Sequence, residues 1–330
     1  MAALRRVISK KSAVTAVSRG GKTRIVLKAA SVALALSLRS YTHHRGFKRW
    51  KQYVRWPWLA AMEPRKALRW FNAIERSTLK KFRAQRHGFE LKPLRPYVTV
   101  DWDIARRMRV ITDSAMFIES LPGTLSRTIR EGGSVEVARI RSKTGRIWPI
   151  LVGWAPRFRK EGELVISFGP LDARERRLAI AVSFERLAPG RWHCYVGCLQ
   201  GGDESPDEIR TMTRDFHGMR PKALLLAALQ KFLFGLGVEK LFAVRHAAQV
   251  SGRKHLLPNP WRKIFFDYDA FWKECGGKLT DDGWFELPRL TIRRPLPSVD
   301  ARKRALYLRR YAFLDDLAQQ LHSSLASHRT

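Results

Sequence analysis

Five short segments rich in Val, Ile and aromatic residues follow one another after Gly132-Gly133, and charged, Gly or Pro turns separate them. They span residues 134–140, 146–153, 163–168, 178–184 and 192–199. Runs of this length and composition are typical of antiparallel strands. A long apolar helix is predicted next, over 220–236, and a buried strand over 238–244. This order predicts an α+β fold built on a central, mostly antiparallel sheet.

A basic helical region is expected before this core. Trp50, Tyr53, Val54 and Trp58 recur at helical spacings between basic residues, and we expect Pro57 and Pro64 to break the helix into pieces. Another helical period runs over 103–118, a short strand is predicted at 284–287, and a basic helix at 301–323. We therefore predict a basic leader (1–44), a helical region (45–130) and an α+β core domain with a C-terminal helix (131–330).

The charge of the chain is strongly positive and unevenly distributed. It has 63 Lys and Arg against 29 Asp and Glu, and residues 1–62 contain 14 basic side chains and no acidic one. Such a field concentrates anions, which include nucleic acid, anionic lipid headgroups, and phosphorylated ligands such as coenzyme A or acyl carrier protein. Charge alone does not choose among them, and an excess that serves only solubility remains an alternative.

The apolar stretch 25–38 raises the question of a membrane segment. Lys28 interrupts it, and its length of about 14 residues is short of the roughly 20 that span a bilayer. We interpret it as a basic amphipathic segment on an anionic membrane surface, with a poorly ordered leader as the alternative. The aromatics of 45–86 have three open interpretations: stacking on single-stranded nucleic acid, a lipid interface, or packing onto the main domain.

Cysteine usage favours a reducing compartment. The three cysteines, Cys194, Cys198 and Cys275, have no disulfide framework and no zinc spacing with histidine. Cys194 and Cys198 are four apart in a strand-like run, so we expect them on the same face. We expect a cytoplasmic protein, with peripheral association to the inner membrane as an option, and no metal.

Four ordered motifs carry a family resemblance: Gly197-Cys-Leu-Gln-Gly201, His217-Gly-Met-Arg-Pro-Lys222, Tyr268-Asp-Ala-Phe-Trp272 followed by Gly276-Gly277, and Lys303-Arg304-Ala-Leu-Tyr307 followed by Arg309-Arg310-Tyr311. Over about residues 95–317 the chain resembles the VirK/YbjX family of Gram-negative bacteria. One departure is visible, because residues 113–115 read Asp-Ser-Ala where relatives often carry a His-aromatic pair. The resemblance implies links to virulence, envelope integrity and resistance to cationic peptides, and it supplies no reaction.

The order of strand 192–199, helix 220–236 and strand 238–244 is similar to the central unit of the N-acetyltransferase superfamily. That resemblance implies that backbone amides at the helix start hold the pyrophosphate of an acyl-coenzyme A. Gly218 permits close approach, Pro221 fits the first turn, and Arg220 and Lys222 add charge. Met219 belongs to the same candidate donor site, although the motif lacks the Gly-rich spacing of the superfamily. Acyl-donor binding and a purely structural Gly-Pro helix start both remain open.

Two residues are candidates for proton transfer. His217, just before the helix, has the ordinary pKa range of a general acid or base, or else serves as a hydrogen-bonding cap. Asp269 lies beside aromatic residues, where a carboxylate can have a raised pKa, or else it caps the helix that bears Trp272.

The other candidates would contact substrate. Gln200 either orients a ligand carbonyl or merely ends a strand, and Tyr268 and Trp272 are predicted to line the acceptor pocket. Lys303, Arg304, Arg309 and Arg310 form a basic face at helical spacing, which is either solvated or a dock for an anionic headgroup or a carrier protein.

The sequence thus leads to two hypotheses. The first is an acyltransferase-like enzyme that uses acyl-coenzyme A or acyl carrier protein and modifies an envelope lipid or amine at the inner membrane surface. Its expected partners are anionic membrane lipid or an envelope lipid precursor, rather than nucleic acid. The second is a non-catalytic accessory factor that binds anionic lipid or RNA.

Overall fold

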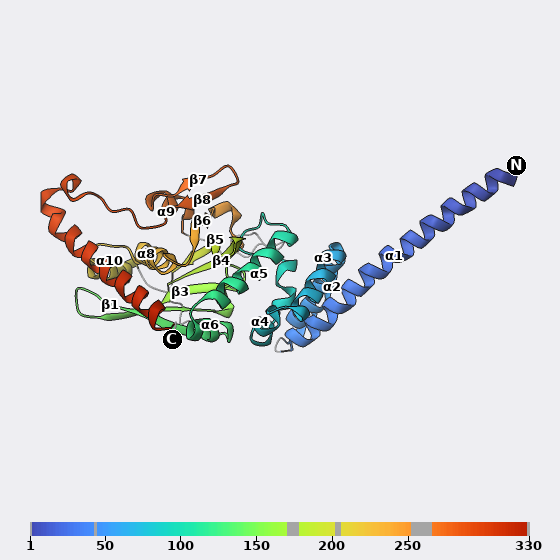
Figure 1. The fold of residues 1–330 in the computed structure, drawn as a ribbon, viewed down its shortest axis with the longest axis horizontal. Helices are drawn as coiled ribbons and strands as arrows, with labels where there is room; N and C mark the ends of the chain where they lie inside the picture. Colours follow the sequence, from blue (N-terminus) through green and yellow to red (C-terminus); the bar gives the residue numbers. More distant parts are fainter. Residues whose placement is uncertain (1, 43–44, 170–177, 202–205, 252–265, 329–330) are drawn as a thin grey trace. The chain divides into compact units, whose positions relative to one another are not determined.

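The computed structural model describes residues 2–42, 45–169, 178–201, 206–251 and 266–328, and it divides into two compact units, Met1–Arg95 and Pro96–Thr330 (Figure 1). The division falls at the Arg95-Pro96 peptide, whereas the boundaries expected from the sequence lie near residues 44 and 130. Helices between residues 104 and 130 therefore belong to the unit that contains the sheet.

The first unit is helical. It consists of α1 (Ala2–Ser40), α2 (Gly46–Met62), α3 (Pro64–Arg76), α4 (Leu79–Gln85) and the 3-10 helix η1 (Phe89–Leu94). α1 packs against both α2 and α3. Pro64 opens α3 as predicted, but the expectation that Pro57 ends a helix was wrong, since it lies inside α2. The buried residues Trp56 and Ala60 on either side of Pro57 anchor α2, and this packing offsets the lost backbone hydrogen bond.

The second unit is built on one eight-stranded sheet in the order β1-β2-β3-β4-β5-β6-β8-β7. The strands are β1 (Ser134–Arg141), β2 (Ile147–Gly153), β3 (Leu164–Phe168), β4 (Ala179–Ala188), β5 (Arg191–Gln200), β6 (Val238–Val244), β7 (Lys278–Leu279) and β8 (Trp284–Leu287). All neighbouring pairs are antiparallel except β5 and β6. The five strands predicted after Gly133 are β1 to β5, so the sheet expected from the sequence is confirmed.

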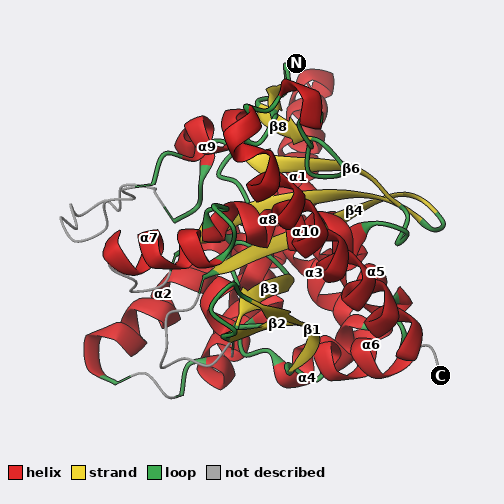
Figure 2. Cartoon of the chain, turned by 90° about the vertical axis from the view of Figure 1, so that its left-hand side faces the viewer, coloured by secondary structure: helices red, strands yellow, loops and turns green. Residues whose placement is uncertain are grey.

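Helices cover this sheet. They are α5 (Ile104–Ser120), α6 (Gly123–Arg130), α7 (Pro206–Asp215), α8 (Pro221–Leu233), α9 (Tyr268–Glu274) and α10 (Ala301–Ser327), with 3-10 turns η2 (Pro156–Phe158), η3 (His246–Ala248) and η4 (Leu296–Ser298). α5 packs on β4 and α6 on β1 and β2, whereas α8 packs on β3 and β4 and α10 on β1. α8 and α10 also contact each other and overlie the sheet (Figure 2). The fold is therefore α+β, as predicted.

The parallel pair places one helix in a defined position. β5 pairs with β6 from Trp192 opposite Val238 to Val196 opposite Ala243, and α8 makes the crossover between the two strands. This is the helix placement that the resemblance to N-acetyltransferases implies. The turn into β6 requires glycine at Gly237, because its φ is +73° and a Cβ there would lie 1.9 Å from the Gly190 carbonyl oxygen.

A bulge at Gly197 changes which side chains of β5 share a face. Between Val196 and Cys198, β5 advances two residues where β4 advances one. A Cβ at Gly197 would lie 2.0 Å from the Glu161 carbonyl oxygen, so only glycine fits the bulge. The expectation that Cys194 and Cys198 share a face was wrong, because the extra residue reverses the alternation of side chains.

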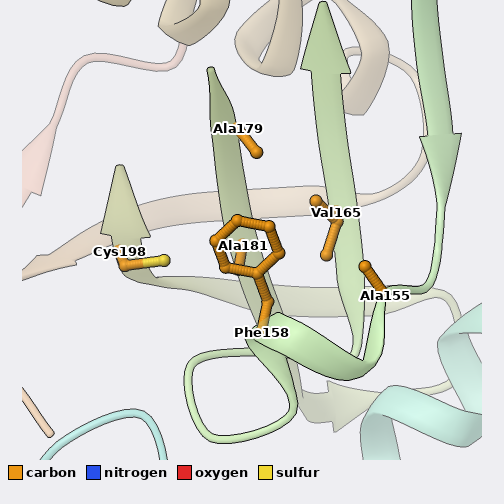
Figure 3. Close-up of a cluster of buried hydrophobic side chains, with 6 residues drawn as sticks. All are labelled: Ala155, Phe158, Val165, Ala179, Ala181 and Cys198. Atoms are coloured by element: carbon orange, nitrogen blue, oxygen red, sulfur yellow. The ribbon is translucent and has the colours of Figure 1, made fainter. Parts of the chain in front are cut away.

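Cys198 is a packing residue of the core. It belongs to a buried cluster with Ala155, Phe158, Val165, Ala179 and Ala181 (Figure 3). The two alanines on β4 leave room for the Phe158 ring, which comes from the turn η2. Burial raises the pKa of the Cys198 thiol, which is what an apolar environment does to a group that ionises to an anion.

Candidate functional site

The start of α8 is the part of the fold that the sequence singled out. Arg220 occupies the N-cap position and its side chain makes no capping hydrogen bond, while Pro221 fills the first helical position. Pro has no N–H, so the next amides of the first turn carry the positive end of the helix dipole. The chain therefore begins a long buried helix with a cationic, side-chain-uncapped turn.

A cationic cavity of about 440 Å³ lies on one side of this turn. Five of its lining residues are basic and one is acidic. The residues come from the α7–α8 turn, α8, the end of α9, the segment 291–294 and α10: Gly218, Met219, Arg220, Ala223, Leu226, Gln230, Phe271, Lys273, Glu274, Cys275, Gly276, Thr291, Ile292, Arg293, Arg294, Tyr307, Arg310, Tyr311 and Leu314. Its charge suits an anionic ligand.

An apolar cavity of about 200 Å³ lies on the other side. Its walls are Leu178, Gly201, Ile209, Met212, Arg220, Pro221, Lys222, Phe266 and Phe271. Arg220 and Phe271 line both cavities, so the two meet at the start of α8. A cationic and an apolar cavity that share a wall can hold the two ends of one amphiphilic molecule.

The two cations of the turn already have contacts of different kinds. Arg220 Nη1 lies 2.8 Å from Glu274 Oε2, and these side chains are 65% and 56% exposed. An ion pair this exposed contributes little to stability, so a phosphate can compete for the guanidinium at small cost. Lys222 Nζ lies 3.1 Å from the centre of the Phe266 ring, a cation–π contact at the wall of the apolar cavity.

Arg310 of α10 fixes the turn that leads into α8. Its Nε and Nη2 each donate to the His217 carbonyl oxygen at 3.1 Å, and its guanidinium lies 4.6 Å from the centre of the Tyr307 ring. His217 and Gly218 have φ values of +52° and +76°, and a Cβ at Gly218 would lie 2.8 Å from Arg310 Nη2. Glycine is thus needed here to let the guanidinium approach. Arg310 belongs to the basic face for which the sequence predicts solvent or a docked anion, whereas its guanidinium in fact binds the His217 carbonyl.

The segment before α10 closes the cationic cavity. Arg293 Nη1 donates to Asp315 Oδ2 at 3.0 Å, and the Arg293 guanidinium lies 5.1 Å from the Tyr311 ring centre. The Tyr311 hydroxyl donates to the Arg294 carbonyl oxygen at 2.7 Å. The hydrogen bonds to Arg293 hold the pKa of the Asp315 carboxyl below its usual range. Sequence reasoning missed this wall, because nothing in 291–294 distinguishes it from an ordinary basic loop.

His217 presents its backbone, and not its ring, to Arg310. The ring packs edge-on against Phe313 at 5.4 Å between centres and lines neither cavity. Burial lowers the pKa of His217, and the positive charges of Arg309 and Lys143 lower it further. The imidazole is therefore neutral at neutral pH and stands outside both cavities.

Asp269 also has a structural partner. Its Oδ1 accepts a hydrogen bond from the His246 backbone N–H at 2.7 Å, and so joins α9 to the turn after β6. The alternative that Asp269 caps the helix was wrong, since α9 begins at Tyr268 and Asp267 is the cap, accepting from the Ala270 N–H at 3.0 Å. Asp269 lines neither cavity.

Tyr268 and Trp272 fill the space where β5 and β6 diverge. The ladder between the strands stops at Val196, and beyond it the Tyr268 hydroxyl accepts from the Leu199 N–H at 3.2 Å and donates to the Leu199 carbonyl at 3.0 Å. Trp272 Nε1 donates to the Val244 carbonyl at 3.0 Å. Both rings are buried. They belong to the core at the strand divergence, and neither lines the two cavities.

The remaining predicted residues lie apart from the cavities. Gln200 ends β5 opposite Ala179. Lys303 and Arg304 are exposed in the first turns of α10, where Arg304 Nε donates to the Val299 carbonyl at 3.1 Å. Neither cavity is lined by these three.

The structure thus brings together four of the predicted residues. Gly218, Met219 and Arg220 line the cationic cavity, and Arg220 and Lys222 line the apolar one. Cys275 is a further lining residue, but burial, with Glu274 beside it, raises its pKa to about 12, so it holds its proton at neutral pH.

The described parts of the chain contain neither a candidate metal site nor a candidate membrane span. No group of three or more His, Cys, Asp or Glu there is placed to hold a metal ion. Among the helices whose residues are described, none combines the length and the apolar character that crossing a bilayer requires.

Comparisons with known proteins connect the chain to relatives of unknown role. The "Uncharacterized protein YbjX" of Escherichia coli K12 is 29% identical over 191 residues, which cover 57% of this chain and 56% of that protein. An uncharacterized protein of Haemophilus influenzae is 33% identical over 132 residues, or 39% of this chain and 43% of that protein. The matches therefore span about half of each relative's length.

A solved structure and a family model complete the comparison. A cAMP-binding acyltransferase from Mycobacterium smegmatis aligns over 65% of each chain at 14% identity, with a TM-score of 0.28, and this value is too low to support an argument. The model of the family described as "Protein of unknown function (DUF535)" matches residues 45–323. With that match and with YbjX among its relatives, the chain belongs to the DUF535 family, the VirK/YbjX family that its motifs indicated.

Proposed function

We propose that the start of α8 binds the phosphate groups of an acyl donor, acyl-coenzyme A or acyl carrier protein, and that the chain transfers the acyl group to an envelope lipid or amine. The observation that carries the proposal is the uncapped, cationic helix start between a cationic cavity and an apolar cavity. Such a donor has a phosphorylated end and an apolar end, and the two cavities offer one environment for each.

The cationic cavity has the chemistry that phosphate oxygens require. Backbone amides at a helix start and arginine side chains are the groups that proteins use to hold phosphate. Arg220 stands at the helix start, and its partner Glu274 is exposed and easily displaced. Arg293 and Arg310 are held by Asp315 and by the His217 carbonyl, which orders the wall before a ligand arrives. Little conformational entropy is then lost on binding.

In the proposed transfer, an acceptor hydroxyl or amine forms the new ester or amide bond as the thioester C–S bond breaks, and its proton passes to the leaving thiolate. His217 and Asp269 line neither cavity, so we assign neither of them as the base. This same observation favours a second candidate function, a non-catalytic factor that binds an anionic lipid or another phosphorylated amphiphile.

The test is binding of palmitoyl-coenzyme A to the full chain, measured by isothermal titration calorimetry beside free coenzyme A and palmitate. Arg220→Ala with Lys222→Ala should weaken binding at least tenfold, since a hydrogen bond to a charged group contributes about 1.5–3 kcal/mol. Lys80→Ala with Lys81→Ala, exposed positions of α4, removes the same charge and should bind as the unmodified chain does.

An equal loss of affinity in the two double variants would show that binding depends only on net charge. If none of the three compounds bound, the proposal would be refuted. Binding without acyl transfer to lipid or amine acceptors would support the non-catalytic candidate instead.

A further inference from the structure

Helix α2 has two opposite apolar faces, and only one of them is buried. Trp56 and Ala60 form the buried face, and the Trp56 ring stacks on Tyr41 at 6.1 Å between centres. The other face is solvent-exposed and continuous, because its members recur at intervals of three and four residues along the helix. They are Phe47, Trp50, Val54, Trp58 and Met62, with exposed fractions of 77%, 62%, 53%, 61% and 62%.

This exposed face of α2 is unusual for a helix that needs only to pack on its neighbours. Exposed apolar residues are common singly, whereas a contiguous stripe of large side chains marks an interaction surface. The buried face already supplies the contacts with α1. Packing within this helical unit therefore does not explain why the stripe is apolar.

The charges beside the stripe identify what it fits. Lys51 lies within the stripe, Lys48 and Arg55 lie along one edge of it, and no acidic residue precedes Glu63 in the sequence. In a dimer formed through this face, these cations would lie next to the same cations of the second copy, and the repulsion between like charges opposes association. Val54 and Met62 offer no flat ring for a nucleobase to stack on. An anionic bilayer fits both the apolar stripe and the basic residues beside it. Its acyl chains accept the apolar side chains, and its negative headgroups attract the basic ones.

We propose that the exposed face of α2 docks on the surface of an anionic lipid bilayer. Trp and Phe enter the boundary between headgroups and acyl chains, where amphipathic rings are favoured, and the basic residues meet the headgroups. Each Lys or Arg close to such a surface adds about fivefold in affinity. The proposal uses neither cavity at α8, so it stands or falls separately from acyl-donor binding.

The test is flotation of the full chain with vesicles of phosphatidylcholine alone or of phosphatidylcholine mixed with the anionic lipid phosphatidylglycerol, whose negative surface potential attracts basic residues. We expect at least tenfold tighter binding to the anionic vesicles. Trp50→Ser with Trp58→Ser should lower that binding at least tenfold, and Lys48→Glu with Lys51→Glu should remove the preference for anionic lipid. The matched control, Leu279→Ser with Leu308→Ser, removes two exposed apolar side chains of the other unit and should bind like the unmodified chain.

The three variants are at exposed positions, and circular dichroism checks that each is folded. Palmitoyl-coenzyme A affinity should be the same in all of them. Unchanged flotation of the tryptophan variant would overturn the proposal. So would single-stranded RNA binding that the tryptophan variant loses while it keeps vesicle binding, or a dimer that the same variant converts to monomer in the absence of lipid.

Discussion

The start of α8 and the divergence of β5 from β6 belong to the same crossover, yet one borders two cavities and the other is filled by protein. At the first, Arg220 is exposed and forms an ion pair with Glu274, which is itself exposed. At the second, Tyr268 takes both backbone groups of Leu199. Diverging strands leave unpaired N–H and C=O groups that need a partner, either a ligand or the chain itself. Here the chain supplies it, so topology alone does not predict where a ligand enters.

The largest expected effect is a difference in the free energy of unfolding between variants of these two regions. Trp272→Ala removes a fully buried ring and its hydrogen bond to Val244, and should lower the free energy of unfolding by about 3–5 kcal/mol. Arg220→Ala, at the exposed pair, should cost about 1 kcal/mol or less. Urea denaturation followed by circular dichroism measures both.

Trp272→Phe is the intermediate variant, because it keeps one six-membered aromatic ring in the core and loses the five-membered ring with its Nε1 hydrogen bond. It should fall between the other two variants and bind palmitoyl-coenzyme A as the unmodified chain does. If Trp272→Phe were as stable as the unmodified chain but bound no donor, the divergence would be part of the binding site, and the contrast drawn above would break.

A smaller effect is expected from Tyr268→Phe, which leaves the shape of the core intact. It removes the hydroxyl from Leu199, so a buried N–H and a buried C=O lose their partner, at a cost of about 1–3 kcal/mol. Amide hydrogen exchange should accelerate at Leu199 more than at Val196, which remains in the ladder with β6. Equal acceleration at both amides would indicate general loosening rather than the loss of one specific partner.

The smallest expected effect concerns the pH dependence of stability at His217, in the turn that leads into α8. His217 has a pKa below its ordinary value in the folded chain, so the unfolded chain binds the proton first as the pH falls. Stability is therefore lost as the pH falls through the unfolded pKa of about 6.5. His217→Asn keeps a residue that accepts positive φ and removes this loss.

The melting temperature of the Asn variant should fall less between pH 7.5 and 5.5 than that of the unmodified chain. The groups around the ring, Arg309, Lys143, Asp215 and Arg310, are the same in both proteins. Parallel curves would show that burial and the neighbouring cations do not lower the pKa of His217 in the folded chain.

Local patterns predicted most of the fold. The strands from β1 to β6, β8, and the helices α5, α8 and α10 follow from alternation, apolar runs and turn residues. Errors arose where long-range contacts decide the outcome. Pro57 continues a helix because α2 is packed on its neighbours, and Cys198 changes face because the Glu161 carbonyl approaches Gly197. Neither the packing of α2 nor the approach of the Glu161 carbonyl can be predicted from the residues next to Pro57 or Gly197.

The candidate site was predicted less completely than the fold. Gly218, Met219, Arg220 and Lys222 line the cavities, since a Gly-Pro helix start with added charge has a direct physical meaning. Tyr268 and Trp272 turned out to be core residues, because aromatics beside a charged motif serve packing as readily as binding. Arg310 and the segment 291–294 are far from α8 in the sequence, and only the tertiary fold places them at the cavity.

The hydrogen bonds from Arg310 to the His217 carbonyl join positions 93 residues apart. During synthesis, β1 to β5 and the α7–α8 turn emerge from the ribosome long before α10 does. A nascent chain can thus assemble its sheet while the cavity still lacks one wall and the turn lacks its clamp. The cavity is therefore complete only after α10 has been synthesised and has packed on the sheet.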